Sequence, residues 1–363
     1  MKEEQPHTSK EQAAKSRLKP SMVIWPILFG LIGVGYMVWK ELHNGLPTEP
    51  ISLVDYWWVF AILLVLCMFM KDLSGMYRMR VMSDVPLTFR QLYRIRMLYE
   101  FTNAATPSAA GGSSLEILFI HREGVKVSRA TSMTILALFL DEMTMIILFP
   151  ALLLLIPYEE MFTSVGGFQY GYVSAFLIGY IVKVVWVALL FIGLFCKPTV
   201  FVKIIGAVFS LKILRRFRYR ALRTAVELRH CAQEIRRESL GYWLRVGCST
   251  FGIWGFKFLI ANMAIMIFNP LSAAGNLMCF ARQYILGIVC MIVPTPGGSG
   301  FAEVMFDGFL AEFIPQAISA VVIIALWRLF TYYYYLFAGV IILPQWLGKS
   351  KLVKTAVSNS PHE

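Results

Sequence analysis

The chain carries several uninterrupted apolar segments of about 20 residues, each long enough to cross the ~30 Å hydrocarbon core of a bilayer as a helix. Continuous apolar runs argue against a β-barrel, whose strands would alternate apolar and polar residues. Composition points the same way, because 58% of the residues are hydrophobic, only 15% are charged and the mean hydropathy is +0.63. The sequence therefore predicts an all-α polytopic membrane protein, not a soluble or disordered chain.

Six of these segments are predicted to be full membrane spans. They are expected at 22–39, 53–70, 130–156, 171–195, 246–268 and 318–343. Lys71, Arg78, Arg94 and Arg96 follow the second span, and the positive-inside rule assigns such basic residues to the cytoplasmic side. Both termini are then expected inside and the protein in the cytoplasmic (inner) membrane. The segments expected outside are 40–52, 157–170 and 311–316.

The predicted organisation is a single membrane domain, residues 21–345, between two polar ends. The ends are a cytoplasmic N-terminus (1–20) and a cytoplasmic tail (346–363). A basic cytoplasmic loop is expected at 197–245. Inside the membrane domain, a first repeat covers about 53–157 and a second covers about 246–343.

Residues 87–121 predict a hairpin of two short helices that enters and leaves the membrane on the cytoplasmic side. Basic clusters flank this segment, and a single crossing would place one of them outside. The centre should break the helix, because proline lacks an N–H and glycine relaxes the backbone. The residues of this break are Thr106, Pro107, Gly111 and Gly112. A broken backbone at membrane depth must face protein or a wet cavity.

A second break resembles the first and predicts an inverted repeat. Its residues are Thr295, Pro296, Gly297 and Gly298. In both breaks Thr-Pro precedes Gly-Gly-Ser and then a glutamate, Glu116 or Glu303. By length, residues 271–315 are either a hairpin from the opposite face or two full crossings. Inverted repeats place a binding site near the midplane, where broken helices meet and their free N–H groups favour an anion.

Ionisable residues inside apolar runs are costly, so each needs a partner or a functional role. The candidate substrate-binding residues are Lys183, Lys257, Arg328, Glu116, Glu303 and Asp141. The alternative is mutual ion pairing that only fixes helix contacts. If one of the three basic residues stays unpaired, a ligand is expected. The four tyrosines at 332–335 are predicted to anchor the chain at the membrane interface, with cavity lining as the second interpretation.

No motif for a cofactor, a metal or catalysis is present in the sequence. The histidines and cysteines lack metal-ligand spacing, and phosphate-binding, dinucleotide and nucleophile-elbow motifs are missing. We therefore expect no cofactor, no metal and no enzyme activity, and we assign no catalytic residue. The net charge of +12 is interpreted as the positive-inside bias, so no nucleic-acid partner is expected.

The two breaks carry a resemblance to a known family. The residues are Pro107-Ser108-Ala109-Ala110-Gly111-Gly112, Glu116 and Arg122-Glu123-Gly124, then Pro294-x-Pro296-Gly297-Gly298-x-Gly300-x-x-Glu303. Over about 20–345 the chain resembles the flippase-like transmembrane region of lysylphosphatidylglycerol synthases. The resemblance implies a protein that moves lipids or lipid-linked molecules between leaflets.

The chain departs from that family in two places. Two-domain members carry a soluble aminoacyl-transfer domain after the membrane region, whereas this chain ends 20 residues after its last predicted span, so synthesis of lysyl lipid is not expected. The family also often places an arginine beside the acid in the span after the first break. Here Leu140-Asp141-Glu142-Met143 has none.

Three functions remain open from the sequence. The first is a protein that translocates or binds an anionic lipid or lipid-linked substrate, with the head group between Lys183, Lys257 and Arg328. The second is an ion-coupled transporter of a small solute, which inverted repeats support equally well. The third is a non-transporting scaffold for a lipid-modifying enzyme. An opening between spans toward lipid would favour the first over the second. The oligomeric state stays open.

Overall fold

A computed structural model describes residues 53–106, 109–162, 169–192, 238–290, 296–315 and 320–358, together with Trp39, His43 and Phe195. All regular elements within these ranges are helices. Six of the described helices are long and apolar enough to cross a membrane. The protein is therefore an all-α polytopic membrane protein, as predicted. The span expected at 22–39, most of the basic loop, Pro107 and Thr295 lie outside the described residues.

The helices of the first half are α3 (Trp57–Met82), α4 (Phe89–Ala105), α5 (Ala109–Arg122), α6 (Val127–Leu153), α7 (Tyr158–Met161) and α8 (Gln169–Phe191). Those of the second half are α11 (Leu240–Met266), α12 (Ala273–Cys290), η3 (Pro296–Gly298), α13 (Phe301–Leu310), η4 (Ala311–Phe313), α14 (Ala320–Arg328), the π-helical turn η5 (Leu329–Tyr333) and α15 (Tyr334–Ser358).

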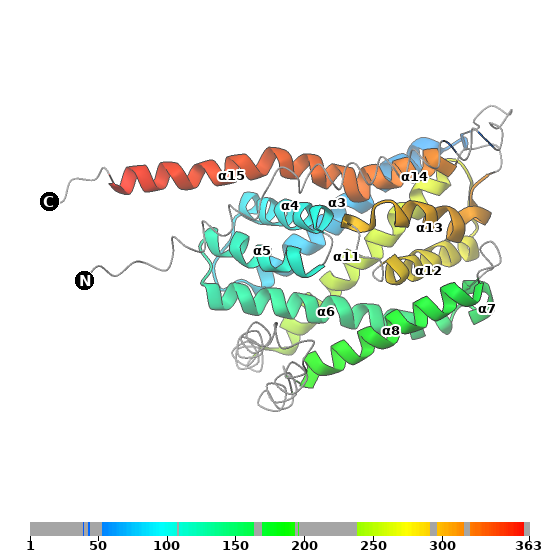
Figure 1. Cartoon of the computed structure of the whole chain (residues 1–363), viewed down its shortest axis with the longest axis horizontal. Helices are drawn as coiled ribbons and strands as arrows, with labels where there is room; N and C mark the ends of the chain where they lie inside the picture. The colour runs from blue at the N-terminus through cyan, green and yellow to red at the C-terminus, as the bar shows by residue number, and fades with distance from the viewer. Residues whose placement is uncertain are drawn as a thin grey trace.

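Two helix hairpins enter the molecule from opposite ends and meet in its middle (Figure 1). The first is α4–α5 and the second is α12–α13. α13 has only ten residues, so it extends about 15 Å, half of the ~30 Å core. Residues 271–315 are therefore a hairpin and not two crossings, which decides between the alternatives that length left open.

The two halves form an inverted repeat, as expected (Figure 1). In each half a long helix, a hairpin and a second long element follow one another, and the directions are reversed between the halves. The long helices α3 and α11 lie antiparallel, because the Val54 N–H at the start of α3 donates to the Ile267 carbonyl beyond α11 at 3.2 Å. They pack closely, since a Cβ on Gly252 would come within 2.8 Å of the Ser74 hydroxyl.

Local signals set several helix ends, and aromatic packing holds the core. α4 begins with a capping box between Thr88 and Gln91. In the core, the ring of Phe149 on α6 contacts Phe176 of α8 at 4.8 Å and lies 6.3 Å from Tyr284 of α12. The Tyr284 hydroxyl also donates to the Met145 carbonyl at 2.8 Å, so its polar end is satisfied inside the molecule.

Several predicted boundaries were wrong because helices continue past the apolar runs. α3 reaches Met82 instead of ending at 70, and it buries Lys71 and Arg78, which the sequence had assigned to the cytoplasmic side. α11 begins at Leu240, inside the segment predicted as loop, and α15 extends through the predicted tail to Ser358. Charged residues with partners inside the protein do not end a membrane helix. The inside–outside orientation stays a prediction.

The tyrosine run is not simply an interfacial anchor. Tyr332 and Tyr335 are buried, because residues three apart share one helix face and that face points into the protein. Tyr333 and Tyr334 are half-buried.

Candidate functional site

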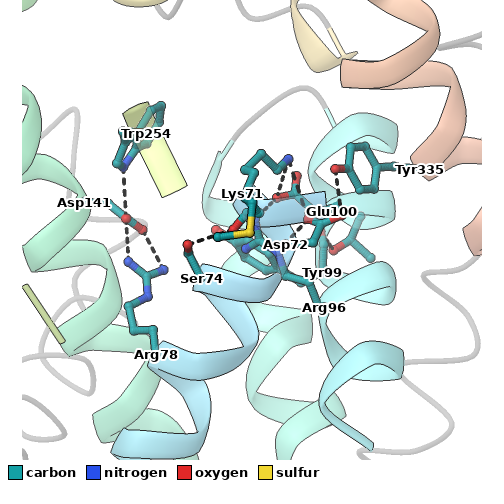
Figure 2. A network of polar contacts seen from close by, with 12 residues as sticks. Lys71, Asp72, Ser74, Arg78, Arg96, Tyr99, Glu100, Asp141, Trp254 and Tyr335 are labelled. Carbon is teal, nitrogen blue, oxygen red and sulfur yellow. Dashed lines mark hydrogen bonds and ion pairs between the residues drawn. The ribbon is translucent and has the colours of Figure 1, made fainter. Parts of the chain in front are cut away.

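A buried group of charges, here called the α3–α4 cluster, joins Lys71, Asp72, Arg96, Glu100 and the hydroxyl of Tyr335 (Figure 2). Arg96 pairs with Glu100 one turn further along α4 and reaches Asp72 of α3 through Nε at 3.2 Å. Lys71 Nζ lies 3.2 Å from Glu100, and Tyr335 Oη donates to Asp72 at 3.0 Å. Two cations and two acids neutralise one another, so the cluster tolerates burial.

The backbone of α3 makes room for this cluster at Gly75. A Cβ at this position would come within 2.8 Å of the Arg96 Cζ. The guanidinium is held by carboxylates on two helices and cannot move away freely. Glycine is therefore required at position 75 because the Arg96 side chain lies against the backbone of α3, and not because of the backbone conformation.

A second group lies about two turns further along α3, where Arg78 makes a bidentate pair with Asp141 of α6 (Figure 2). The two Nη–Oδ distances are 2.6 and 3.1 Å. Arg78 also donates to the Thr250 hydroxyl, and the Trp254 indole donates to Asp141 at 3.0 Å. The arginine that pairs with Asp141 therefore comes from α3 and not from the next residue in α6, where the family motif often has one.

Two of the three predicted basic residues also have acidic partners. Lys183 of α8 pairs with Glu142 of α6. Arg328 lies 2.8 Å from Glu303, and it donates to the carbonyls of Gly297 and Gly298 at 3.2 and 3.3 Å. Arg328 therefore bridges the last long element to the turn of the second hairpin.

The turn of the second hairpin is built on glycines with positive φ. Gly297, Gly298 and Gly300 have φ angles of 56°, 70° and 84°. A Cβ on Gly297 would lie 2.3 Å from the Tyr332 ring and 3.3 Å from the Ala104 carbonyl oxygen. Since Ala104 lies in the last turn of α4, the two hairpin tips meet, as the sequence predicted.

The first break is shorter than expected. Thr106 is extended, with φ −108° and ψ 141°, but α5 begins at Ala109, so Gly111 and Gly112 lie in its first helical turn. The glycine pair therefore does not break the helix; Thr106 is the described non-helical residue between α4 and α5.

Lys257 differs from the other predicted cations. It lies nine residues before the end of α11, which places it about 14 Å from that end of the helix. Even at this depth its side chain is exposed. Its ammonium lies over the Trp254 ring at 4.4 Å. Among the residues that the structure describes, no carboxylate pairs with it. Glu116 is buried on α5, and its charged neighbours include Arg78 and Arg96.

A lateral groove of about 580 Å³ lies between α3 and α11. Its lining residues are Met70, Leu73, Ser74, Tyr77, Leu244, Arg245, Cys248 and Ser249. Most of these side chains are apolar, and Arg245 supplies one positive charge. Tyr77, Leu244, Arg245 and Cys248 are exposed, so the groove opens on the outer flank of the helix pair.

The sequence missed the most connected part of the site. It identified Asp141 and the second hairpin, but it treated Lys71, Arg78 and Arg96 as markers of the cytoplasmic side. One signal was available, because Arg96 and Glu100 are four residues apart and such pairs face each other on a helix.

This arrangement agrees with a family match along most of the chain. The model of the lysylphosphatidylglycerol synthase TM region matches residues 23–339. The chain belongs to this family. A UPF0104 membrane protein of Archaeoglobus fulgidus is 25% identical over 346 residues, which cover 90% of this chain and 98% of that protein. No solved structure matches the chain.

Proposed function

We propose that this protein binds an anionic lipid or lipid-linked substrate and translocates it between the leaflets of the cytoplasmic membrane. One observation carries the proposal: two re-entrant hairpins from opposite ends of the molecule meet at Gly297 and Ala104. Charged groups lie on the helices around this junction, including the Arg328–Glu303 pair. Broken helices at mid-depth supply polar backbone where lipid alone could not solvate a head group.

The lateral groove favours a lipid over a small soluble solute. A head group can move through a polar interior while its acyl chains stay in the bilayer only if the protein opens sideways. The groove between α3 and α11 has apolar walls suited to an acyl chain. No nucleotide-binding motif accompanies the site, so the proposed movement is passive, ion-coupled or driven by a partner. The proposed role is that of a transport protein and not of an enzyme.

Leaflet exchange in proteoliposomes tests the proposal. The protein is reconstituted with a fluorescent anionic phospholipid, and a membrane-impermeant quencher reports the pool that reaches the outer leaflet, with and without a proton gradient. In vesicles with wild-type protein, the quencher should reach a larger fraction of the labelled lipid than in protein-free vesicles, where it reaches only the lipid of the outer leaflet. Cys248→Trp, which fills the groove, should slow exchange, whereas Ile62→Trp on the exposed flank of α3 should not.

Two outcomes would count against translocation of lipid. If wild-type vesicles match protein-free vesicles under both conditions, the proposal fails. If trapped soluble anions leave the vesicles while the lipid label stays, the ion-coupled solute transporter becomes the better assignment.

A further inference from the structure

Among the residues that the structure describes, the charges inside the membrane region neutralise one another in pairs or groups, and Lys257 and Glu116 take part in no such ion pair. The α3–α4 cluster holds two cations and two acids. The other described pairs are Arg78–Asp141, Arg94–Glu123, Arg129–Glu238, Lys183–Glu142, Arg282–Glu312 and Arg328–Glu303. In each, one positive charge meets one negative charge. An ammonium at membrane depth without such a partner carries a large free-energy cost unless water solvates it or a ligand supplies an anion.

Lys257 is exposed on the face of α11 that is turned toward α3, α4 and α6. Its electrostatic neighbours are Lys71, Glu100, Asp141 and Arg96, which come from α3, α4 and α6. The side chains of Glu100 and Asp141 retain 18% and 16% exposure, whereas those of their basic partners retain 7% or less. Within the described part of the chain, the unpaired ammonium of Lys257 thus lies near the partly exposed carboxylates of Glu100 and Asp141, both already neutralised by other cations.

We propose that Lys257 binds the phosphate of a singly charged phosphodiester, with the Trp254 ring as the floor of the site. The inference rests on the proposed function and names the head-group chemistry of its substrate. One phosphodiester brings the single negative charge that Lys257 lacks. The second charge of a phosphomonoester or diphosphate would lie against Glu100 and Asp141 and be repelled. Glu116 does not supply the negative charge that Lys257 lacks, because the charged neighbours of Glu116 are Arg78, Arg96 and Asp141.

Equilibrium binding to the purified protein in detergent tests the site apart from transport. The probes are dihexanoyl phosphatidylglycerol, a phosphodiester; dihexanoyl phosphatidic acid, a phosphomonoester; and glycerophosphoglycerol, a soluble phosphodiester. Calorimetry should show the phosphatidylglycerol binding more tightly than the phosphatidic acid. Tighter binding of the lipid than of glycerophosphoglycerol assigns the ligand to the membrane, and equal binding assigns the same site to a soluble phosphodiester.

Substitutions at Lys257 identify the residue that carries the binding. Lys257→Gln should raise the Kd for phosphatidylglycerol at least about tenfold, since a charged hydrogen bond is worth more than 1.4 kcal/mol. Lys257→Arg should retain most of the affinity. Arg80→Gln, which removes an exposed cation from α3 outside the groove, is the matched control and should leave the Kd unchanged.

The results separate this inference from the proposed function. An unchanged Kd in Lys257→Gln, an equal loss in Arg80→Gln, or tighter binding of phosphatidic acid would overturn the phosphodiester site. Binding that depends on Lys257 while leaflet exchange is absent would keep the site and reject translocation. Leaflet exchange by a protein whose lipid binding does not depend on Lys257 would keep translocation and reject the phosphodiester site.

Discussion

The two hairpins occupy equivalent places in the inverted repeat but are held by different physical means. Around the first hairpin, charges from α3, α4 and α6 form two groups of ion pairs inside the protein (Figure 2). Around the second, left-handed glycines make a tight turn that Arg328 and the Tyr332 ring cover. The repeat therefore fixes the path of the chain, while each half carries its own chemistry.

This difference separates two kinds of contribution to the site. A cluster of ion pairs fixes the distance between helices and depends on every member, because removing one leaves an uncompensated charge. A glycine turn depends on backbone conformation and close approach, so a single methyl group can disturb it. The three predictions below use this contrast, from the largest expected effect to the smallest.

Arg96→Met should be the most damaging of these substitutions. It leaves Asp72 and Glu100 to share Lys71, and a broken buried pair costs about 3–5 kcal/mol of unfolding free energy. Unfolding by a denaturing detergent measures the change. Arg80→Met, at an exposed position on α3, should have little effect. Should the yield of folded Arg96→Met be too low, Asp72→Asn provides a milder variant with the same expected direction.

An Arg96→Met loss no larger than that of Arg80→Met would contradict the cluster. It would mean that water or lipid head groups already solvate these charges. The first hairpin would then be held by apolar packing alone, and the contrast with the second hairpin would disappear.

Gly297→Ala should cost about 1–3 kcal/mol, because the residue has φ 56° and its new Cβ would meet Tyr332. Gly298→Ala has the same backbone problem, but its nearest neighbour is at an ordinary 3.5 Å, so it should cost less. Gly255→Ala, a helical site with no atom within 4 Å, is the control and should be neutral or stabilising. Unfolding in the same detergent assay measures all three.

A Tyr332→Ala background sharpens the test of Gly297. Removal of the ring relieves the close contact but leaves the strained φ, so the cost of Gly297→Ala should fall to that of Gly298→Ala. No change in this background would show that the backbone alone sets the requirement.

Sequence reasoning identified the repeat because its signals are local. Proline, glycine pairs and the parity of the spans predicted the first hairpin, left the second open between a hairpin and two crossings, and predicted that the two breaks meet, which the contact of Gly297 with Ala104 confirms. Local signals were less reliable within the first break. Gly111 and Gly112 resemble the second glycine pair in sequence, but they lie in the first turn of α5. Whether a glycine pair bends the chain depends on the contacts around it.

The charge cluster was missed because its partners come from distant segments. A lysine after an apolar run marks the cytoplasmic side when it is solvated, and it marks the interior when a carboxylate from another helix meets it. Only the fold tells these cases apart, as Arg78 and Asp141 illustrate with 63 residues between them. The tyrosine run shows the same limit, since consecutive residues point in different directions around a helix.

Tyr335→Phe should have the smallest effect, and it tests how the halves are joined. Tyr335 comes from the second repeat but donates to Asp72 of the first at 3.0 Å. The loss should be about 1 kcal/mol, at the low end for a charged acceptor, because Arg96 also holds Asp72 and the ring still packs under Lys71. Tyr334→Phe, which removes a hydroxyl contact to Tyr93, should cost less than about 0.5 kcal/mol.

A double-mutant cycle of Tyr335→Phe with Asp72→Asn isolates this bond from other effects of each change. Residues in contact should show a coupling free energy of about 0.5 kcal/mol or more, whereas the pair Tyr334→Phe with Asp72→Asn should be additive. Coupling at Tyr335 would mean that η5 and α15 link the position of the glycine turn to the charge cluster, since Tyr332 on the adjoining η5 covers that turn. Additivity at both positions would leave the two hairpins as independent units that merely touch.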